Sequence, residues 1–96
     1  MEGVALAYTL VTCHFVGDYV LQLDFIAKTK GENWWHLLAH CVTYTAPFAA
    51  VFGIDWRIAW LLATHLFVDA LKARWGRIGY LTDQTLHLLA MAAYLI

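Results

Sequence analysis

The 96-residue sequence has no serine, a single proline and few charged side chains, which make up 14% of the chain. It has no low-complexity or strongly polar run, so the composition excludes a disordered chain. The formal net charge of −1 provides no basic surface of the kind that binds nucleic acid. Hydrophobic residues make up 62% of the chain. A soluble domain of this length has too little interior to bury them, which favours one integral membrane domain over residues 1–96.

Four apolar segments approach the roughly 20 residues that a membrane-spanning helix requires. They cover residues 4–27, 33–53, 56–73 and 78–96, and three short links separate them. Because short links make neighbouring helices antiparallel, the sequence predicts an all-α, up-down four-helix bundle in a membrane. A re-entrant half-helix is the alternative for the last segment, in which only residues 85–96 are apolar apart from His87.

The six basic residues are unevenly distributed between the two ends of this predicted bundle. Arg57 stands alone near one end, and the others flank the first and third links: Lys28, Lys30, Lys72, Arg74 and Arg77. Basic residues accumulate on the cytoplasmic side of membrane proteins. We therefore expect both basic links in the cytoplasm and both termini outside it.

Histidine and aspartate occur in pairs spaced four residues apart, one pair in each predicted helix. Side chains at this spacing share one helix face, and ionisable groups within a membrane usually face the bundle interior. Counted inward at ~1.5 Å per residue, the pairs fall in one layer in the cytoplasmic half of the membrane. They use every histidine in the chain: His14 with Asp18, His36 with His40, His65 with Asp69, and Asp83 with His87.

Imidazole and carboxylate groups are the ligands of zinc, manganese and non-haem iron, and helical bundles hold such ions with residues from several helices. All eight paired residues are therefore candidate ligands for one or two divalent ions, with zinc preferred over manganese or iron. A divalent ion would also offset much of the charge of the three aspartates. Three further residues are candidates to orient a ligand or contact a substrate: Gln22, Gln84 and Lys72.

Other interpretations of these residues stay open at this point. A single pair is typical of polar contacts between membrane helices, and His–Asp ion pairs or a proton relay need no metal. Cys13 and Cys41 lie in mid-span, where cysteine usually packs as a small apolar residue. A supporting ligand role for either sulfur is the alternative.

The chain resembles an uncharacterised family of small bacterial and phage membrane proteins, domain of unknown function 3307. The matching motifs are HxxGDYVLQxD from His14, Lys30, LLxH ending at His40, HxxxDxxK from His65 and DQxxH from Asp83. The resemblance covers nearly the whole chain and implies a polytopic protein of the bacterial inner membrane. A looser similarity, mainly in HxxxD, is to membrane-bound proteins described as metal-dependent hydrolases. The functional residues that the resemblance implies are His14, Asp18, Gln22, His40, His65, Asp69, Asp83, Gln84 and His87, whereas His36 matches less clearly.

These residues favour a metal-dependent hydrolase that acts on a lipid headgroup phosphoester or another membrane substrate. The metal would polarise a phosphoryl or carbonyl oxygen and lower the pKa of bound water, with Asp18 or Asp83 as general base. Since there is no serine nucleophile, direct attack by water is expected. The alternatives are a non-enzymatic module that conducts metal ions or protons, with or without homo-oligomerisation, and haem binding by two histidines.

Overall fold

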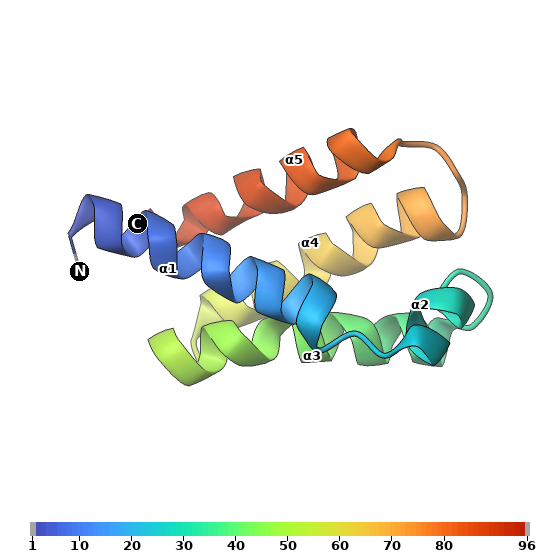
Figure 1. The fold of residues 1–96 in the computed structure, drawn as a ribbon, viewed down its shortest axis with the longest axis horizontal. Helices are drawn as coiled ribbons and strands as arrows, with labels where there is room; N and C mark the ends of the chain where they lie inside the picture. Colours follow the sequence, from blue (N-terminus) through green and yellow to red (C-terminus); the bar gives the residue numbers. More distant parts are fainter. Residues whose placement is uncertain (1, 96) are drawn as a thin grey trace.

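The computed structural model describes residues 2–95, and all of the regular elements in that range are helices (Figure 1). The prediction of an all-α chain is confirmed. The elements are α1 (Gly3–Phe15), the π-helical segment η1 (Val16–Val20), α2 (Asp24–Thr29), α3 (Trp34–Phe52), α4 (Trp56–Ala73), α5 (Tyr80–Ala90) and the 3₁₀ segment η2 (Met91–Leu95).

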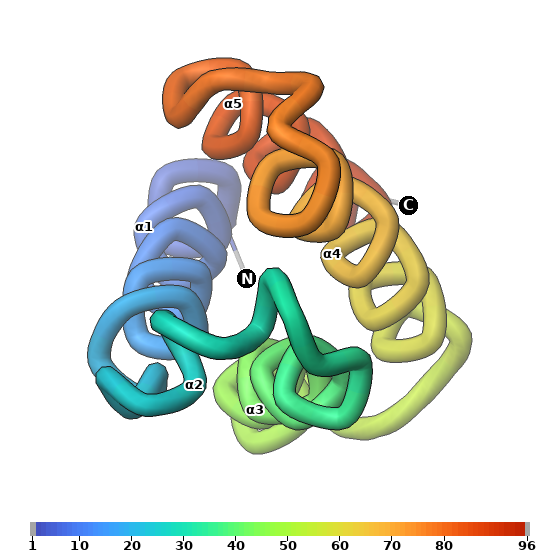
Figure 2. The backbone as a smooth tube through the Cα atoms, turned by 90° about the vertical axis from the view of Figure 1, so that its right-hand side faces the viewer, coloured from blue at the N-terminus to red at the C-terminus, as the bar shows by residue number. Residues whose placement is uncertain are grey.

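The four long helices alternate in direction along the molecule (Figure 1). Viewed end-on, α1, α3, α4 and α5 surround a common centre, and α2 lies beside α3, in front of the end of α1 (Figure 2). That end, which we call the α2 end, also carries the α2–α3 and α4–α5 links. Both termini and the α3–α4 link lie at the opposite end, which we call the terminal end (Figure 1).

The predicted continuous helix over residues 4–27 is wrong. The helix widens to a π-helix at Val16, where the Leu21 N–H donates to the Val16 carbonyl at 2.9 Å, and the backbone is extended at Leu23. Gly17 fixes this segment against α3, since a Cβ atom there would lie 2.5 Å from the Tyr44 carbonyl oxygen. A new helix begins at Asp24, whose charge suits a helix N-terminus. Beyond the break, α2 packs beside the start of α3.

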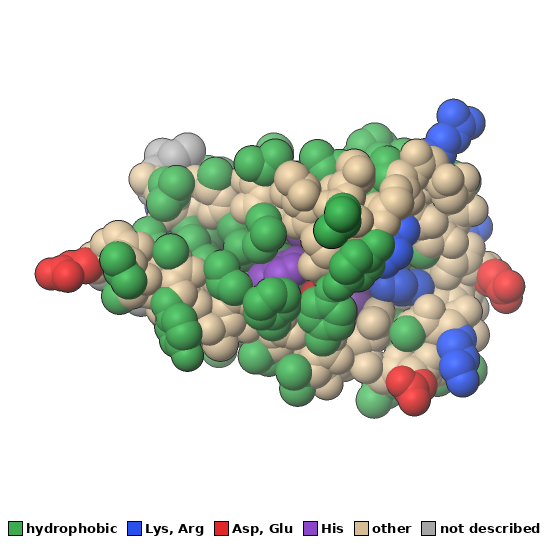
Figure 3. Space-filling view, turned by 45° about the horizontal axis from the view of Figure 1, so that its top comes forward, with side chains coloured by type: hydrophobic (Ala, Val, Ile, Leu, Met, Phe, Trp, Pro, Cys, Tyr) green, Lys and Arg blue, Asp and Glu red, His purple; other side chains and the backbone are tan. Residues whose placement is uncertain are grey.

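The interior of the molecule is unusually polar, whereas its surface is strongly apolar. Large hydrophobic side chains cover much of the surface (Figure 3), and Val4, Trp35 and Leu81 each expose more than three quarters of their area. Nine polar or ionisable residues are buried: His14, Asp18, Lys30, His40, Thr45, His65, Asp69, Asp83 and His87. Soluble domains rarely bury so many ionisable groups.

By length and composition, one helical stretch among the described residues, Gly3–Val20, is suited to crossing a membrane. Core helices of soluble proteins and signal sequences share those properties. The ionisable residues of α3 and α4, such as His40, His65 and Asp69, lower the mean hydropathy of those two helices, and α5 has 11 residues.

Candidate metal centre

Three side chains from three helical segments converge in the bundle interior. His40 comes from α3, His65 from α4 and Asp18 from η1. The two Nε2 atoms lie 3.0 Å apart, and Asp18 Oδ1 lies 3.2 Å from His40 Nε2 and 3.6 Å from His65 Nε2. All three residues are buried, and we call them the triad.

The triad has the spacing of three ligands around one tetrahedral ion. Zinc bonds of 2.0–2.1 Å to nitrogen and oxygen place neighbouring tetrahedral ligands roughly 3.3–3.4 Å apart. The three separations of 3.0, 3.2 and 3.6 Å bracket that value. A neutral imidazole carries one N–H, so two facing Nε2 atoms cannot both donate to each other. The donors therefore fit a divalent ion with three protein ligands and one remaining position.

The charges near the three buried aspartates single out the triad. Lys30 Nζ lies 3.0 Å from Asp69 Oδ2, and Lys72 Nζ lies 3.7 Å from Asp83 Oδ2. Asp18 is surrounded instead by imidazoles and an amide. A buried carboxylate requires a compensating charge or hydrogen bonds. A cation bound at the triad would provide that charge for Asp18.

Gln84 connects the triad to the next layer of polar groups. Its amide nitrogen donates to Asp18 Oδ2 at 3.0 Å and to Asp83 Oδ2 at 3.1 Å. The amide oxygen therefore faces His14 and accepts a hydrogen bond from His14 Nε2 at 2.9 Å. His14 Nδ1 is then the acceptor for the Tyr44 hydroxyl at 2.8 Å. This chain of bonds holds the Asp18 carboxylate in place and directs His14 toward Gln84 rather than toward the triad.

A histidine–aspartate pair lies beside the triad on α5. His87 Nε2 is 3.2 Å from Asp83 Oδ1, one helical turn away. The His87 ring stacks on the His65 ring with centroids 4.0 Å apart, and Tyr44 also stacks on His65 at 3.9 Å. These contacts fix the plane of the His65 ring, which determines where Nε2 points.

Asp69 joins the triad to α2 through a buried lysine. Its Oδ2 lies 3.3 Å from His40 Nε2 and 3.0 Å from Lys30 Nζ, which also donates to Gln22 Oε1 at 2.8 Å. Lys30 is 8% exposed. The lysine thus neutralises Asp69 and ties the fold of α2 to the site.

Comparison with known families places the whole cluster within one match. The family model described as "Protein of unknown function (DUF3307)" matches residues 6–96. The chain belongs to this family. The resemblance expected from the sequence motifs is confirmed. Neither the search of curated proteins nor the search of solved structures gives a match.

Of the eight metal ligands predicted for this DUF3307 member, the structure brings seven into one polar cluster. His36 lies apart from it, with Nδ1 2.5 Å from the Thr29 hydroxyl and its ring against Phe25. His36 lies apart because α2 packs against that part of α3 and contacts the His36 side chain. Of the other seven, the triad offers converging donor atoms, whereas His14, Asp69, Asp83 and His87 surround it.

The two cysteines pack in hydrophobic clusters, whereas the three residues predicted to orient a ligand or contact a substrate lie at the polar cluster. The free thiols of Cys13 and Cys41 are buried in separate hydrophobic clusters. Gln22, Gln84 and Lys72 all contact the polar cluster or its lysine, as described above.

Sequence reasoning did not select two residues that the structure brings into the cluster, Tyr44 and Lys30. Tyr44 follows His40 by four residues, so its helical spacing could have revealed it. Lys30 is among the positions that match the family, which was the available signal, and it reaches the cluster because the α2–α3 turn packs against α4.

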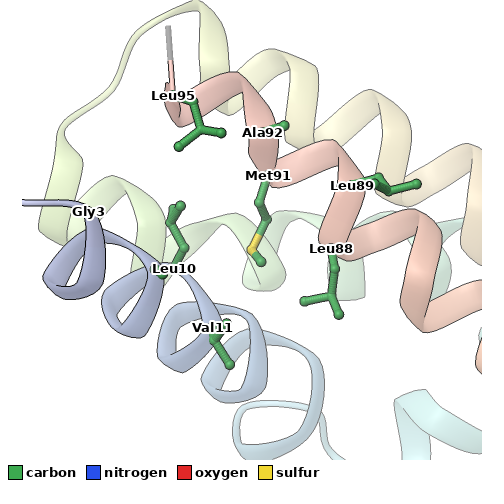
Figure 4. Close-up of a pocket in the computed structure, with 9 residues that line it drawn as sticks. Gly3, Leu10, Val11, Leu88, Leu89, Met91, Ala92 and Leu95 are labelled. Carbon is green, nitrogen blue, oxygen red and sulfur yellow. The ribbon is translucent and has the colours of Figure 1, made fainter.

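A pocket that reaches the site differs from the apolar pocket shown in Figure 4. A pocket of about 200 Å³ reaches His40 beside the non-helical residues 21–23, and Leu21, Leu23 and Ile26 line it. Histidine side chains are also visible between hydrophobic and basic side chains in Figure 3. The pocket in Figure 4 lies between α1 and α5, and all of its lining residues are apolar or glycine. It contains no group of the polar cluster.

Proposed function

We propose that the chain is an integral membrane metalloprotein that hydrolyses a membrane-borne substrate, with a lipid headgroup phosphoester as the favoured class. Asp18, His40 and His65 hold the ion, for which zinc is preferred over manganese or iron. The observation that carries the proposal is the meeting of three donor atoms at 3.0–3.6 Å around the aspartate that has imidazole and amide partners instead of lysine.

The distribution of side chains supports a membrane location. Residues that lower the hydropathy of α4, such as His65 and Asp69, are buried, whereas Trp60 and Phe67 on the same helix are exposed. Polar groups that face inward and apolar groups that face outward suit a lipid environment. By the same argument the molecule spans the membrane as an up-down four-helix bundle.

The basic residues support one orientation in a bacterial inner membrane. The α2 end carries five of the six lysine and arginine residues, because the α2–α3 and α4–α5 links both lie there. The positive-inside rule places this end in the cytoplasm and the termini outside. The polar cluster then lies nearer to the cytoplasmic face.

The chemistry proposed for this site is hydrolysis by water. A divalent ion supplies Lewis acidity and activates water at neutral pH. Asp18 points its Oδ1 at the two imidazoles and is best assigned as a ligand. Asp83 is the better general base, since its carboxylate lies beside the triad and contacts His87 and Gln84. Because the chain has no serine, it offers no serine nucleophile.

The pocket beside residues 21–23 supports a substrate that arrives from the bilayer. Its leucine and isoleucine side chains form an apolar wall that ends at His40. A lipid or another membrane-embedded molecule can thus approach a triad residue without crossing a charged surface.

Conduction of ions or protons through one chain is less well supported. On the terminal side of the polar cluster, Leu10, Phe48, Leu61 and Met91 pack into a hydrophobic core. The buried histidines and aspartates are therefore confined to one part of the bundle, which suits a reaction site better than a pathway.

The proposal is tested by assaying the zinc-loaded protein, reconstituted in vesicles, for release of headgroup phosphate from phospholipids. Asp83→Asn should lower the rate by about 10²–10⁴-fold while metal content stays unchanged. Arg77→Gln, at an exposed position of the α4–α5 link outside the cluster, is the matched control for a charge change at the same end. Equal rates for the Asp83→Asn and unsubstituted proteins would contradict the role of Asp83, and no turnover of any phospholipid would contradict the substrate class.

A further inference from the structure

A second cavity lies at the α2 end and adjoins the polar cluster. Its volume is about 590 Å³. Glu32 is the acidic residue among those that line it, against four basic ones: Lys28, Lys30, Lys72 and Arg74. A concave surface with this excess of cations concentrates anions.

Arg74 has hydrogen-bonding capacity that the protein leaves unused. Its guanidinium lies over the Trp34 ring, with Cζ 4.0 Å from the ring centroid. Nε and Nη1 are buried, and neither has a hydrogen-bond partner. Buried donors without an acceptor are costly, and a guanidinium matches the oxygens of a phosphate group in a two-point contact. Arg74 also lines the cavity, and the chain offers these donors no acceptor, so an anion in the cavity suits this guanidinium.

The cavity wall is built by close packing. At Gly31 a Cβ atom would lie 2.4 Å from the Ala73 carbonyl oxygen, so the α2–α3 turn fits directly against α4. This contact holds Lys28 and Lys30 on one side of the cavity and Lys72 and Arg74 on the other.

Two of the lining lysines also reach the aspartates of the polar cluster. Lys30 pairs with Asp69 at 3.0 Å and Lys72 with Asp83 at 3.7 Å. Only the Lys30 side chain lies between a ligand in the cavity and Asp69, and only the Lys72 side chain lies between it and Asp83. Lys28 and Arg74 are the cations left to bind the ligand's charge.

We infer that this cavity binds the phosphate group of the substrate, with Arg74 as its principal contact. The inference rests on the proposed function, because it assigns the substrate class of the same site. The phosphate group can belong to a lipid headgroup at the cytoplasmic surface or to a free phosphate compound, since both present the same oxygens.

The test compares Arg74→Gln with Arg77→Gln, an exposed basic residue at the same end that does not line the cavity. In one arm, inorganic phosphate is titrated into detergent-purified protein by calorimetry. In the other, the binding of spin-labelled phosphatidic acid and of spin-labelled phosphatidylcholine to the reconstituted protein is measured by electron spin resonance. Arg74→Gln should weaken binding about tenfold, and Arg77→Gln should leave it unchanged. Helical circular dichroism of both variants verifies the fold.

The two arms separate the sources of the phosphate group. Binding of phosphatidic acid over phosphatidylcholine supports a headgroup site, and binding of inorganic phosphate supports a site for free phosphate compounds. Binding in neither arm, or equal losses in the two variants, would overturn the inference. Metal content is measured on the same samples so that the two proposals can fail separately. Phosphate binding by a protein that holds no metal would contradict the proposed metal centre and leave the phosphate site standing.

Discussion

His40 and His65 face each other across the α3–α4 interface with their Nε2 atoms 3.0 Å apart. The two residues are 25 positions apart in sequence and both are buried. Two imidazoles in this arrangement share a proton or share a cation. Asp18 Oδ1 lies within 3.6 Å of both Nε2 atoms and adds the third donor atom that the proposed metal ion requires.

The two histidines of α3 should behave differently on substitution. His40→Ala removes a triad donor and should abolish stoichiometric zinc binding, whereas His36→Ala should retain one ion per chain because His36 contacts Thr29 instead. Metal analysis of both purified variants checks this. Retention of zinc by His40→Ala would rule out the triad as assigned here.

Gln84 should affect metal affinity without being a ligand. Gln84→Leu removes the hydrogen bond to Asp18 Oδ2 and leaves that carboxylate free to rotate. Loss of such an orienting contact typically weakens metal binding by about 10–100-fold. Competition with a zinc chelator of known affinity measures the change. An unchanged affinity would show that Gln84 does not orient Asp18.

Gly17 should tolerate no side chain. Gly17→Ala places a Cβ atom 2.5 Å from the backbone oxygen of Tyr44, so η1 must move away from α3. Overpacking of this kind costs about 1–3 kcal/mol. Thermal unfolding in detergent should therefore shift downward, whereas Gly3→Ala, with nothing within 4 Å of the added atom, should have no such effect. Equal unfolding temperatures for the two variants would contradict the close approach of η1 and α3.

Lys30 should stabilise the fold through Asp69. Lys30→Met leaves a buried carboxylate without its cation, which costs about 3–5 kcal/mol. Replacing the aspartate as well, in Lys30→Met/Asp69→Asn, should recover much of that loss because the unpaired charge is removed. Denaturant unfolding of both variants tests the coupling. Lys28→Met, on the exposed face of α2, provides the control. Additive effects of the two substitutions would argue against a direct ion pair.

The sequence contains much of the information about the site because helical spacing is regular. The pairs spaced by four residues predicted which side chains share a face, and the depth count predicted that helices from distant parts of the chain would bring them to one level. The structure brings seven of those eight side chains together. Which donors converge on one point depends on side-chain orientations, because Tyr44 stacks on the His65 ring and Gln84 donates a hydrogen bond to the Asp18 carboxylate.

The break after η1 could not be predicted from the apolar pattern. Residues 4–27 are continuously suited to a helix, and the interruption depends on the contact of Gly17 with a backbone 27 positions away. The roles of His36 and Lys30 both follow from that break, since α2 covers the first and carries the second inward. Local sequence does not encode such a break.

The metal content of the purified chain tests the central proposal most directly. Protein extracted in mild detergent and dialysed against trace zinc should contain one zinc ion per chain by inductively coupled plasma mass spectrometry. Asp18→Asn should lose that ion while keeping its helical circular dichroism. A chain that binds no divalent metal, and whose unfolding temperature is the same with and without chelator, would contradict the account.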